Sequence, residues 1–356
     1  MSLDDLSPMV SVVVPCRNEA DHIEGCVRSI LAQQQPEGGF EVIVSDGMSD
    51  DRTREILKRL ATENFRVRVI DNPERIVSTA LNRAIRNAAG DVIIRMDAHT
   101  EYAPDYIQQC VETLANTGAD NVGGPWVAKG SGFLSSAVAA AFQSAFAVGG
   151  AKGHNTNYEG IVDTVYLGCW PRHLFDRIGF FDEELVRNQD DEFNLRLTRA
   201  GGKIWQSPRI KSFYRPRGSL SALFKQYMQY GYWKVRVIQK HRIPASIRHI
   251  VPGCFVLLLL ALPMFSVRVP AAAAAWAVLA AIYIVCNLLA SIVTAARTQF
   301  EFLVVLPIVF ACYHLAYGCG FLRGYFDFVI FRRKPPESYT TLTRKSTPSK
   351  RTDRRL

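Results

Sequence analysis

Residues 10–19, VSVVVPCRNE, decide how the rest of the sequence is interpreted. The run Val10–Val14, four valines with one serine, predicts a buried strand, and a polar turn follows it at once. Apolar residues then recur at helical spacing, and the same order of strand and helix repeats, with strands expected at Phe40–Val44, Val67–Ile70 and Val92–Ile94. Alternating strands and helices predict an α/β domain built on a largely parallel sheet.

The last third of the chain contains three long apolar stretches, at Val251–Val267, Ala271–Ala296 and Phe302–Leu322. A helix needs about 20 apolar residues to cross the hydrocarbon core of a bilayer. The second and third stretches reach that length, whereas the first is shorter and contains Pro252 and Pro263. We therefore expect a transmembrane region at 249–322 with two or three spans, the first stretch being the one that could be re-entrant or tilted instead.

The segments on either side of these stretches are basic. Residues 221–248 mix aromatic with basic side chains, which predicts an amphipathic helix lying in the membrane interface, or alternatively an ordinary helix of the soluble core. Residues 323–356 carry 10 Lys and Arg against 3 Asp and Glu, and we expect a disordered tail. Because basic flanks prefer the cytoplasm, an even number of crossings and a cytoplasmic tail are predicted.

The distribution of charge also excludes one class of partner. The formal net charge is +9, yet residues 1–240 hold 28 Lys and Arg against 29 Asp and Glu, so the basic excess lies beside the apolar stretches. Such an excess is typical of contact with anionic lipid, and no nucleic-acid partner is expected. Eight cysteines without a C-x-x-C pair, and no secretory signal at the first residues, indicate a multi-pass protein of the cell (inner) membrane with its soluble domain in the cytoplasm.

Polar motifs follow three of the predicted strands, at Pro15–Glu19, Asp46–Thr53 and Asp97–His99. Ligands of open parallel sheets bind outside the carboxyl ends of the strands, where these motifs would converge. Each motif alone is explained equally well as a turn with a helix cap, and for Ser49 and Asp50 capping is the preferred interpretation. Together the three motifs predict a nucleotide site.

Two of these motifs suggest specific contacts. The Asp46 carboxylate is suited to accept hydrogen bonds from a pyrimidine or a ribose. Asp97 and His99 are spaced to bring a divalent metal, Mn²⁺ or Mg²⁺, to a diphosphate whose oxygens complete the coordination, and the imidazole favours manganese. The alternative for His99 is a hydrogen bond to the following turn.

The order of these motifs resembles the inverting family-two glycosyltransferases of the GT-A fold, and most of all the succinoglycan-type exopolysaccharide glucosyltransferases, from Val10 through the first apolar stretch. The resemblance implies a GT-A domain, a Rossmann-like mixed sheet, over residues 1–220. It also implies nucleotide contacts at Pro15, Arg17, Asn18, Glu19, Asp46 and Asp97. His99 stands where the family carries the second Asp of Asp-x-Asp.

A fourth motif, NQDDEFNLR at residues 188–196, resembles the family's Glu-Asp-x-Glu run. Asp190 matches the general base, which an inverting transfer needs to take the proton of the acceptor hydroxyl. Gln189 replaces the preceding Glu. The alternative is a helix N-terminus enriched in acids, which fits Asp191 and Glu192 better than Asp190, and Asp191 remains the second choice of base.

Several further residues carry weaker predictions. The resemblance places acceptor contacts near the glycine-rich segments Gly123–Pro125 and Gly149–His154, which are alternatively plain turns. Arg215 and Arg217 could bind a diphosphate, although surface arginines are more often solvated.

Gln229 and Trp233, predicted acceptor or diphosphate contacts, keep the spacing of the Gln-x-x-Arg-Trp signature of processive synthases. Tyr232 stands at the Arg position, so a single-addition enzyme is expected.

The sequence thus predicts a membrane-anchored, inverting, metal-dependent glycosyltransferase. It would transfer a hexose from a UDP-sugar, the nucleotide-sugar donor, to a lipid-linked saccharide acceptor in exopolysaccharide or cell-surface glycan synthesis. A polyprenyl-phosphate sugar synthase is the alternative. A non-catalytic nucleotide-sugar-binding membrane protein would not need Asp190, and a dinucleotide-dependent oxidoreductase would need glycines that Pro15–Glu19 lacks.

Overall fold

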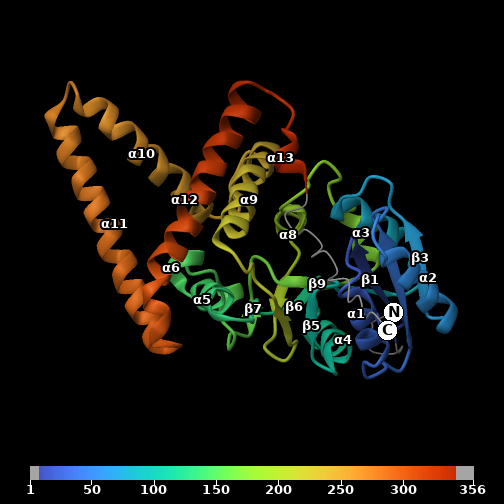
Figure 1. The fold of residues 1–356 in the computed structure, drawn as a ribbon. Helices are drawn as coiled ribbons and strands as arrows, with labels where there is room; N and C mark the ends of the chain where they lie inside the picture. The colour runs from blue at the N-terminus through green and yellow to red at the C-terminus, as the bar shows by residue number, and fades with distance from the viewer. Residues whose placement is uncertain (1–7, 342–356) are drawn as a thin grey trace, which may run out of the picture.

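The computed structural model describes residues 8–341, and a mixed eight-stranded sheet forms the centre of its N-terminal half (Figure 1). Four parallel strands form one side in the order β3-β2-β1-β4. Their bounds are β1 Val10–Cys16, β2 Phe40–Asp46, β3 Val67–Asp71 and β4 Val92–Arg95. The four strands predicted from the sequence are therefore confirmed, each one to two residues longer than expected.

The other side of the sheet brings in antiparallel pairing. Strand β9 (Tyr166–Pro171) lies antiparallel between β4 and β6 (Asn121–Gly124). Beyond them, β10 (Ile204–Gln206) pairs parallel with β6, and β8 (Gly160–Ile161) forms the edge. A separate small sheet joins β5 (Thr100–Tyr102), β11 (Ser212–Tyr214) and β7 (Val127–Ala128).

The glycine pair Gly123 and Gly124 lies inside strand β6, not in a loop as the sequence suggested. A Cβ on Gly123 would lie 2.8 Å from the Val165 side chain, and one on Gly124 would lie 1.9 Å from the Ile210 carbonyl oxygen. Val165 and Ile210 approach this strand too closely to leave room for a side chain. The two glycines are therefore explained by close packing.

Helices cover both faces of the sheet. One face packs on α1 (Ile23–Leu31), α2 (Thr53–Glu63) and α4 (Tyr106–Thr117), the other on α3 (Val77–Arg86), α7 (His173–Ile178) and α8 (Gln189–Arg199). Along β1, Val12 and Val14 enter the first core and Val13 the second. Burial on both faces explains why the strand is mostly apolar, and its one buried hydroxyl, on Ser11, donates to Glu41 Oε1 at 2.7 Å.

Helix α9 (Leu220–His241) connects this domain to the apolar helices. It packs along α12 (Leu306–Gly324) so closely that a Cβ on Gly231 would lie 2.0 Å from the Tyr317 carbonyl oxygen. A Cβ on Gly320 would likewise lie 2.0 Å from the Met228 carbonyl oxygen. The helix predicted for 221–248 thus ends at His241 and is enclosed between the domain and α12, with Tyr232 and Trp233 fully buried.

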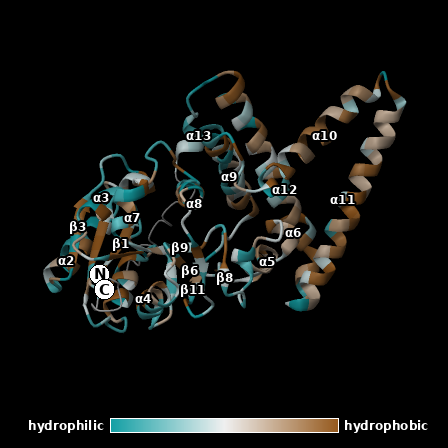
Figure 2. Cartoon of the chain, turned by 180° about the vertical axis from the view of Figure 1, so that it is seen from behind, coloured by the Kyte–Doolittle hydropathy of each residue, from teal (hydrophilic) through white to brown (hydrophobic). Residues whose placement is uncertain are grey.

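Three helices are long and apolar enough to cross a membrane, at Ile247–Ser266, Pro270–Arg297 and Leu306–Ile330. They contain α10 (Val251–Ser266), α11 (Pro270–Arg297) and α12. Helices α10 and α11 project from the rest of the protein as an apolar hairpin (Figures 1 and 2). Only 11% and 17% of their most apolar windows are buried, against 44% for α12. The helix most covered by protein is therefore α12, whereas the sequence had singled out the first stretch as the doubtful span.

After α12 the chain returns to α9. The Tyr339 ring stacks on Tyr232 with 4.0 Å between centroids, and the Trp233 indole N–H donates to the Tyr339 carbonyl oxygen at 2.9 Å. The Gln229 amide donates to the carbonyl oxygens of Ser338 and Thr341, both at 3.0 Å. These contacts hold α13 (Glu337–Thr340) against α9. The tail predicted for 323–356 lies outside the described residues from residue 342 onward.

Candidate active site

A cavity of about 710 Å³ runs from the carboxyl ends of the strands to the apolar helices. Its strand end is lined by the turns after β1 and β4 and by the start of α8. Its opposite end is lined by α5 (Phe133–Phe142), α6 (Ala145–Val148), α9, the start of α10, and α12. One continuous space therefore joins the predicted nucleotide edge to the helices that could enter a membrane.

Four of the predicted nucleotide-binding residues, Pro15, Arg17, Asn18 and Glu19, line this cavity. The turn that carries them is locked to the turn after β2. The Asn18 backbone N–H donates to Ser49 Oγ at 2.8 Å, and the Asp50 N–H donates to Asn18 Oδ1 at 3.0 Å. Ser49 thus joins two strand-end turns. The sequence had suggested that Ser49 caps α2, and the structure shows that it does not.

Asp46 lies beneath the cavity and not on its wall. Only 1% exposed, its carboxylate accepts hydrogen bonds from Ser49 Oγ at 2.5 Å and from Arg54 Nη1 at 2.9 Å. Asn72 and Arg75, which follow β3, do line the cavity. The sequence analysis missed them, although the rule that ligands bind at strand ends applies to β3 as well.

Asp97 and His99 both line the cavity after β4, near Glu19. Arg95, a residue that the sequence analysis overlooked, is 7% exposed and donates to both oxygens of Asp97, at 2.9 and 3.1 Å. His99 Nδ1 is buried, makes no hydrogen bond among residues 8–341, and lies 3.5 Å from Glu19 Oε1. A buried nitrogen without a hydrogen-bond partner is suited to a ligand.

These residues fit a divalent metal only in part. Within the described residues no group of three or more His, Cys, Asp or Glu side chains could hold an ion. Asp97 and His99 would supply two ligands, and a hard cation takes oxygens from phosphate and water for the rest. The fit therefore depends on a bound diphosphate.

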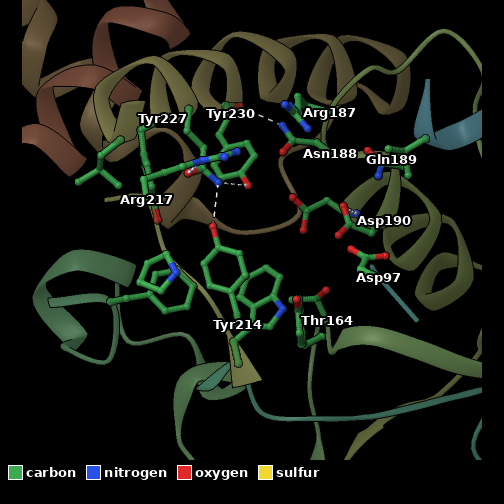
Figure 3. A pocket seen from close by; sticks show the side chains of 18 of the residues that line it. Asp97, Thr164, Arg187, Asn188, Gln189, Asp190, Tyr214, Arg217, Tyr227 and Tyr230 are labelled. Carbon is green, nitrogen blue, oxygen red and sulfur yellow. Dashed lines mark hydrogen bonds between the residues drawn. The ribbon is translucent and has the colours of Figure 1, made fainter. Parts of the chain in front are cut away.

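Asp190 and Asp191 lie in the first turn of helix α8, and their surroundings shift their pKa values in opposite directions. Burial, and then the charge of Asp191, raise the pKa of Asp190, while Arg95 partly opposes the rise. Burial acts the same way on Asp191, but the nearby Lys234, His249 and Arg248 outweigh it and lower its pKa. Lys234 is 4% exposed and donates to Asp191 Oδ2 at 2.5 Å. Asp190 thus combines a raised pKa with an orientation toward Asp97 (Figure 3).

Aromatic side chains form the wall facing these acids, among them Trp126, Tyr166, Tyr214 and Tyr230. A hydrogen-bonded chain orders part of this wall: the Gln226 amide donates to Tyr214 Oη at 3.3 Å and to Tyr230 Oη at 2.7 Å (Figure 3). Flat aromatic faces next to polar groups are suited to sugar rings.

The weaker predictions separate into residues on the cavity wall and residues away from it. Arg217 lines the cavity and donates to Gln226 Oε1 at 3.1 Å. Arg215 instead donates to Glu101 and is not part of the wall. Gln229 and Trp233 also lie off the wall, because their side chains hold residues 338–341, so their position does not support the predicted acceptor contact. The segment Gly149–His154 contributes Gly149, Ala151, Gly153 and His154 to the wall.

Comparisons with known proteins agree on one family. The model for "Glycosyl transferase family 2" matches residues 11–169. The succinoglycan biosynthesis protein ExoA of Rhizobium meliloti is 38% identical over 264 residues, which are 71% of this chain and 77% of that protein. The dolichyl N-acetyl-alpha-D-glucosaminyl phosphate 3-beta-D-2,3-diacetamido-2,3-dideoxy-beta-D-glucuronosyltransferase of Methanococcus voltae is 28% identical over 323 residues, covering 88% of this chain and 96% of that protein.

Among solved structures, a mannosyltransferase from Pyrobaculum calidifontis in complex with GDP-Man and Mn²⁺ has a similar fold. Its TM-score is 0.58 at 21% identity, and the match covers 89% of this chain and 88% of that one.

Proposed function

Because the chain belongs to glycosyl transferase family 2 and has the GT-A fold that its sequence predicted, we propose that it is an inverting enzyme acting on a prenyl-linked saccharide. It transfers a hexose from a nucleoside-diphosphate donor, with UDP favoured, to a hydroxyl of that acceptor. The names of two relatives support this proposal, since one acts in succinoglycan biosynthesis and the other on a dolichyl-linked sugar phosphate.

The observation that carries the proposal is the position of Asp190. Its carboxylate faces the cavity beside Asp97, and burial with the neighbouring Asp191 raises its pKa. A carboxylate with a raised pKa accepts a proton more readily, as a general base at neutral pH must. Asp191 is paired with Lys234 and is poorly suited to this role. We assign the base to Asp190, which takes the proton from the acceptor hydroxyl as that oxygen attacks the anomeric carbon.

Asp97 and His99 would hold a divalent metal, for which the Mn²⁺ in the mannosyltransferase structure is a precedent. When bound, such an ion neutralises charge on the leaving diphosphate. Arg95 orients the Asp97 carboxylate by donating to both of its oxygens. The turn Pro15–Glu19, fastened to the turn after β2, presents the wall against which the nucleotide binds.

The membrane part of the proposal rests on the α10–α11 hairpin. Both helices expose apolar side chains along their length, and α10 with the turn before it has the 20 residues needed to cross. Helix α12 is instead packed on α9, and residues 338–341 return to α9 on the side of the domain. A hairpin of two crossings leaves both flanks on that side, in the cytoplasm, so we propose α10–α11 as the membrane anchor of an inner-membrane protein.

The test is transfer by the purified full-length protein. Nucleotide release is measured from UDP-glucose, UDP-galactose and GDP-mannose, with Mn²⁺ or EDTA, and with or without a bacterial lipid extract. We expect release that needs both the metal and the lipid fraction, and a product whose new linkage has inverted anomeric configuration by NMR. Absence of release from every donor, or retention of configuration, would contradict the proposal.

The alternative acceptor is a bare polyprenyl phosphate. A phosphate oxygen is already anionic and needs no base, so Asp190→Asn would retain transfer to that acceptor. The raised pKa of Asp190 favours a hydroxyl acceptor instead.

A further inference from the structure

A group of basic and phenolic side chains lines the cavity between the carboxylates at its strand end and the apolar helices. We call it the basic cluster: Lys234 on α9, Arg248 and His249 in the turn before α10, and Tyr317 on α12. All four line the same cavity as Asp190, and their segments are up to 83 residues apart in sequence. None of them was singled out from the sequence.

The four residues surround Asp191. Lys234 Nζ donates to its carboxylate, and Lys234, His249 and Arg248 lower its pKa in that order against the effect of burial. Arg248 also donates to Asp163. Two carboxylates therefore accompany Lys234 and Arg248, and the many N–H groups of an ammonium and a guanidinium leave donors for a further anion.

Two polar atoms in the basic cluster have no hydrogen-bond partner among residues 8–341. They are His249 Nδ1 and the Tyr317 hydroxyl, and both are buried. A buried polar group without a partner costs about 1–3 kcal/mol, so two of them on one cavity wall indicate a ligand that supplies the bonds.

One side of the Arg248 side chain is closely packed. Gly149, with φ of 63°, packs on it so that a Cβ would lie 3.0 Å from Arg248 Cβ. The turn that follows α6 thus packs directly on the aliphatic part of the Arg248 side chain, and the guanidinium pairs with Asp163.

Beyond the basic cluster the cavity wall becomes apolar. Phe146 on α6 and Val251 and Pro252 at the start of α10 line it, together with Ala147 and Val148. Next to this end lies the exposed hairpin of α10 and α11, whose residues are mostly hydrophobic (Figure 2). Lys234 of the basic cluster contacts Asp191, and Arg248 and His249 precede Val251 and Pro252 in the chain, so the order along the cavity is carboxylates, basic cluster, apolar wall.

From this order we infer that the basic cluster binds the phosphate group of a prenyl-linked acceptor, at a site distinct from the one for the donor diphosphate. The inference rests on the proposed function and names the part of the acceptor that these residues hold. Because Lys234 of the cluster pairs with Asp191, the neighbour of Asp190 in sequence, a phosphate bound there lies a short way from the base. The acceptor sugar would occupy the aromatic-walled space beside Asp190, and the prenyl chain would follow the apolar wall toward the hairpin.

The experiment measures binding of farnesyl diphosphate to the full-length protein in detergent, with the donor site saturated by UDP and Mn²⁺. Farnesol and inorganic pyrophosphate are the comparison ligands, to separate a lipid phosphate from free phosphate. The variants are Arg248→Ala and Tyr317→Phe, and Arg268→Ala is the control because it removes one positive charge from the exposed hairpin turn. UDP binding and thermal unfolding of each variant show that it is folded.

We expect farnesyl diphosphate to bind in the presence of UDP, and more tightly than either comparison ligand. Arg248→Ala should weaken it roughly 10- to 100-fold and Tyr317→Phe roughly 5- to 10-fold, as loss of a charge-assisted hydrogen bond predicts, with no change for Arg268→Ala. Displacement of farnesyl diphosphate by UDP, pyrophosphate binding as tight as that of the prenyl compound, or unchanged affinity in both variants would overturn the inference.

The outcome is separable from that of the proposed function. If the wild type consumes nucleotide-sugar and Arg248→Ala keeps the wild-type KM for the lipid acceptor, the phosphate site is wrong and the transferase stands. If no donor is consumed while farnesyl diphosphate binding depends on Arg248, the proposed function fails and the phosphate site stands.

Discussion

Replacing Asp190 and Asp191 separately by Asn tests which of two adjacent carboxylates takes the proton. The exchange removes a charge and keeps the shape of the side chain. The backbone N–H of Asp191, which donates to Asp190 Oδ1 at 3.0 Å, keeps an oxygen acceptor in Asp190→Asn. Any change in rate therefore reports the lost basicity and not a collapsed helix start.

For catalysis we expect Asp190→Asn to lower the rate of transfer roughly 10²- to 10⁴-fold, the range for loss of a general base. Affinity for UDP should stay within a few-fold of wild type, because the base acts on the acceptor side. In the wild type, the acid limb of kcat/KM should lie above about pH 4, the ordinary pKa of Asp, because the pKa of Asp190 is raised.

The two variants should change stability in opposite directions. Since the folded chain raises the pKa of Asp190, ionisation of this group lowers the free energy of unfolding as pH rises above about 4, up to the folded pKa. Asp190→Asn removes that loss and should unfold at a higher temperature near neutral pH. Asp191 has a lowered pKa, so its stabilisation is present above its ordinary pKa and disappears as pH falls through the folded value.

Asp191→Asn leaves Lys234, 4% exposed, without its carboxylate, which should cost roughly 3 kcal/mol. The assays are single-turnover transfer, calorimetric titration with UDP, and thermal unfolding in detergent between pH 4 and 8. If Asp190→Asn keeps the wild-type rate and Asp191→Asn does not, the base is Asp191. A lower unfolding temperature for Asp190→Asn at neutral pH would refute the electrostatic reasoning.

Three further predictions address the metal, the membrane hairpin and the α9–α12 contact. Asp97→Ala and His99→Ala should each weaken Mn²⁺-dependent UDP binding, with His99→Asp the mildest change; metal-independent binding by the wild type, seen in calorimetry, would remove the metal from the account. Single cysteines at Arg268, Glu301 and Ser349, in a chain whose native cysteines have been replaced, should react with an impermeant thiol reagent in intact cells only at Arg268. Labelling at Glu301 alone would show that α11 and α12 are the crossing pair, and labelling at Arg268 and Ser349 would show three spans. Gly231→Ala should lower the free energy of unfolding by about 1–3 kcal/mol because its Cβ would overlap the Tyr317 carbonyl. The control is Gly25→Ala in helix α1, where nothing lies within 4 Å of the new Cβ, and it should raise the free energy of unfolding by about 0.5–1 kcal/mol. Equal effects of the two substitutions in thermal unfolding would contradict the packing argument.

Much of the domain structure is predictable from the sequence because it depends on residues that are close together in the chain. A strand buried on both faces is mostly apolar and the turn after it is polar, so Val10–Val14 and the residues after it identify both a strand and a site edge. The parallel arrangement then brings three strand ends to one edge of the sheet. For this reason the fold was predictable without coordinates, whereas the family was predicted from the resemblance of the motifs to known glycosyltransferases.

Other features depend on contacts between distant segments, which no local pattern encodes. Gly123 and Gly124 resemble a turn in the sequence, yet they lie inside a strand, where Val165 and Ile210 leave no room for a side chain. Gln229 and Trp233 resemble a signature for acceptor binding, but here they fasten residues 338–341.

The sequence by itself determined the strands, the strand-end motifs and the apolar character of the C-terminal helices, since each depends on residues close together in the chain. Only the tertiary structure decided that Asp190 and Asp191 differ in pKa, because burial raises the pKa of Asp190 while Lys234, on a remote segment, lowers that of Asp191. It likewise decided that α12 is covered by α9 while α10 and α11 are exposed. Hydropathy states whether a helix is able to enter lipid, and packing against the rest of the chain determines how much of its surface is left to do so.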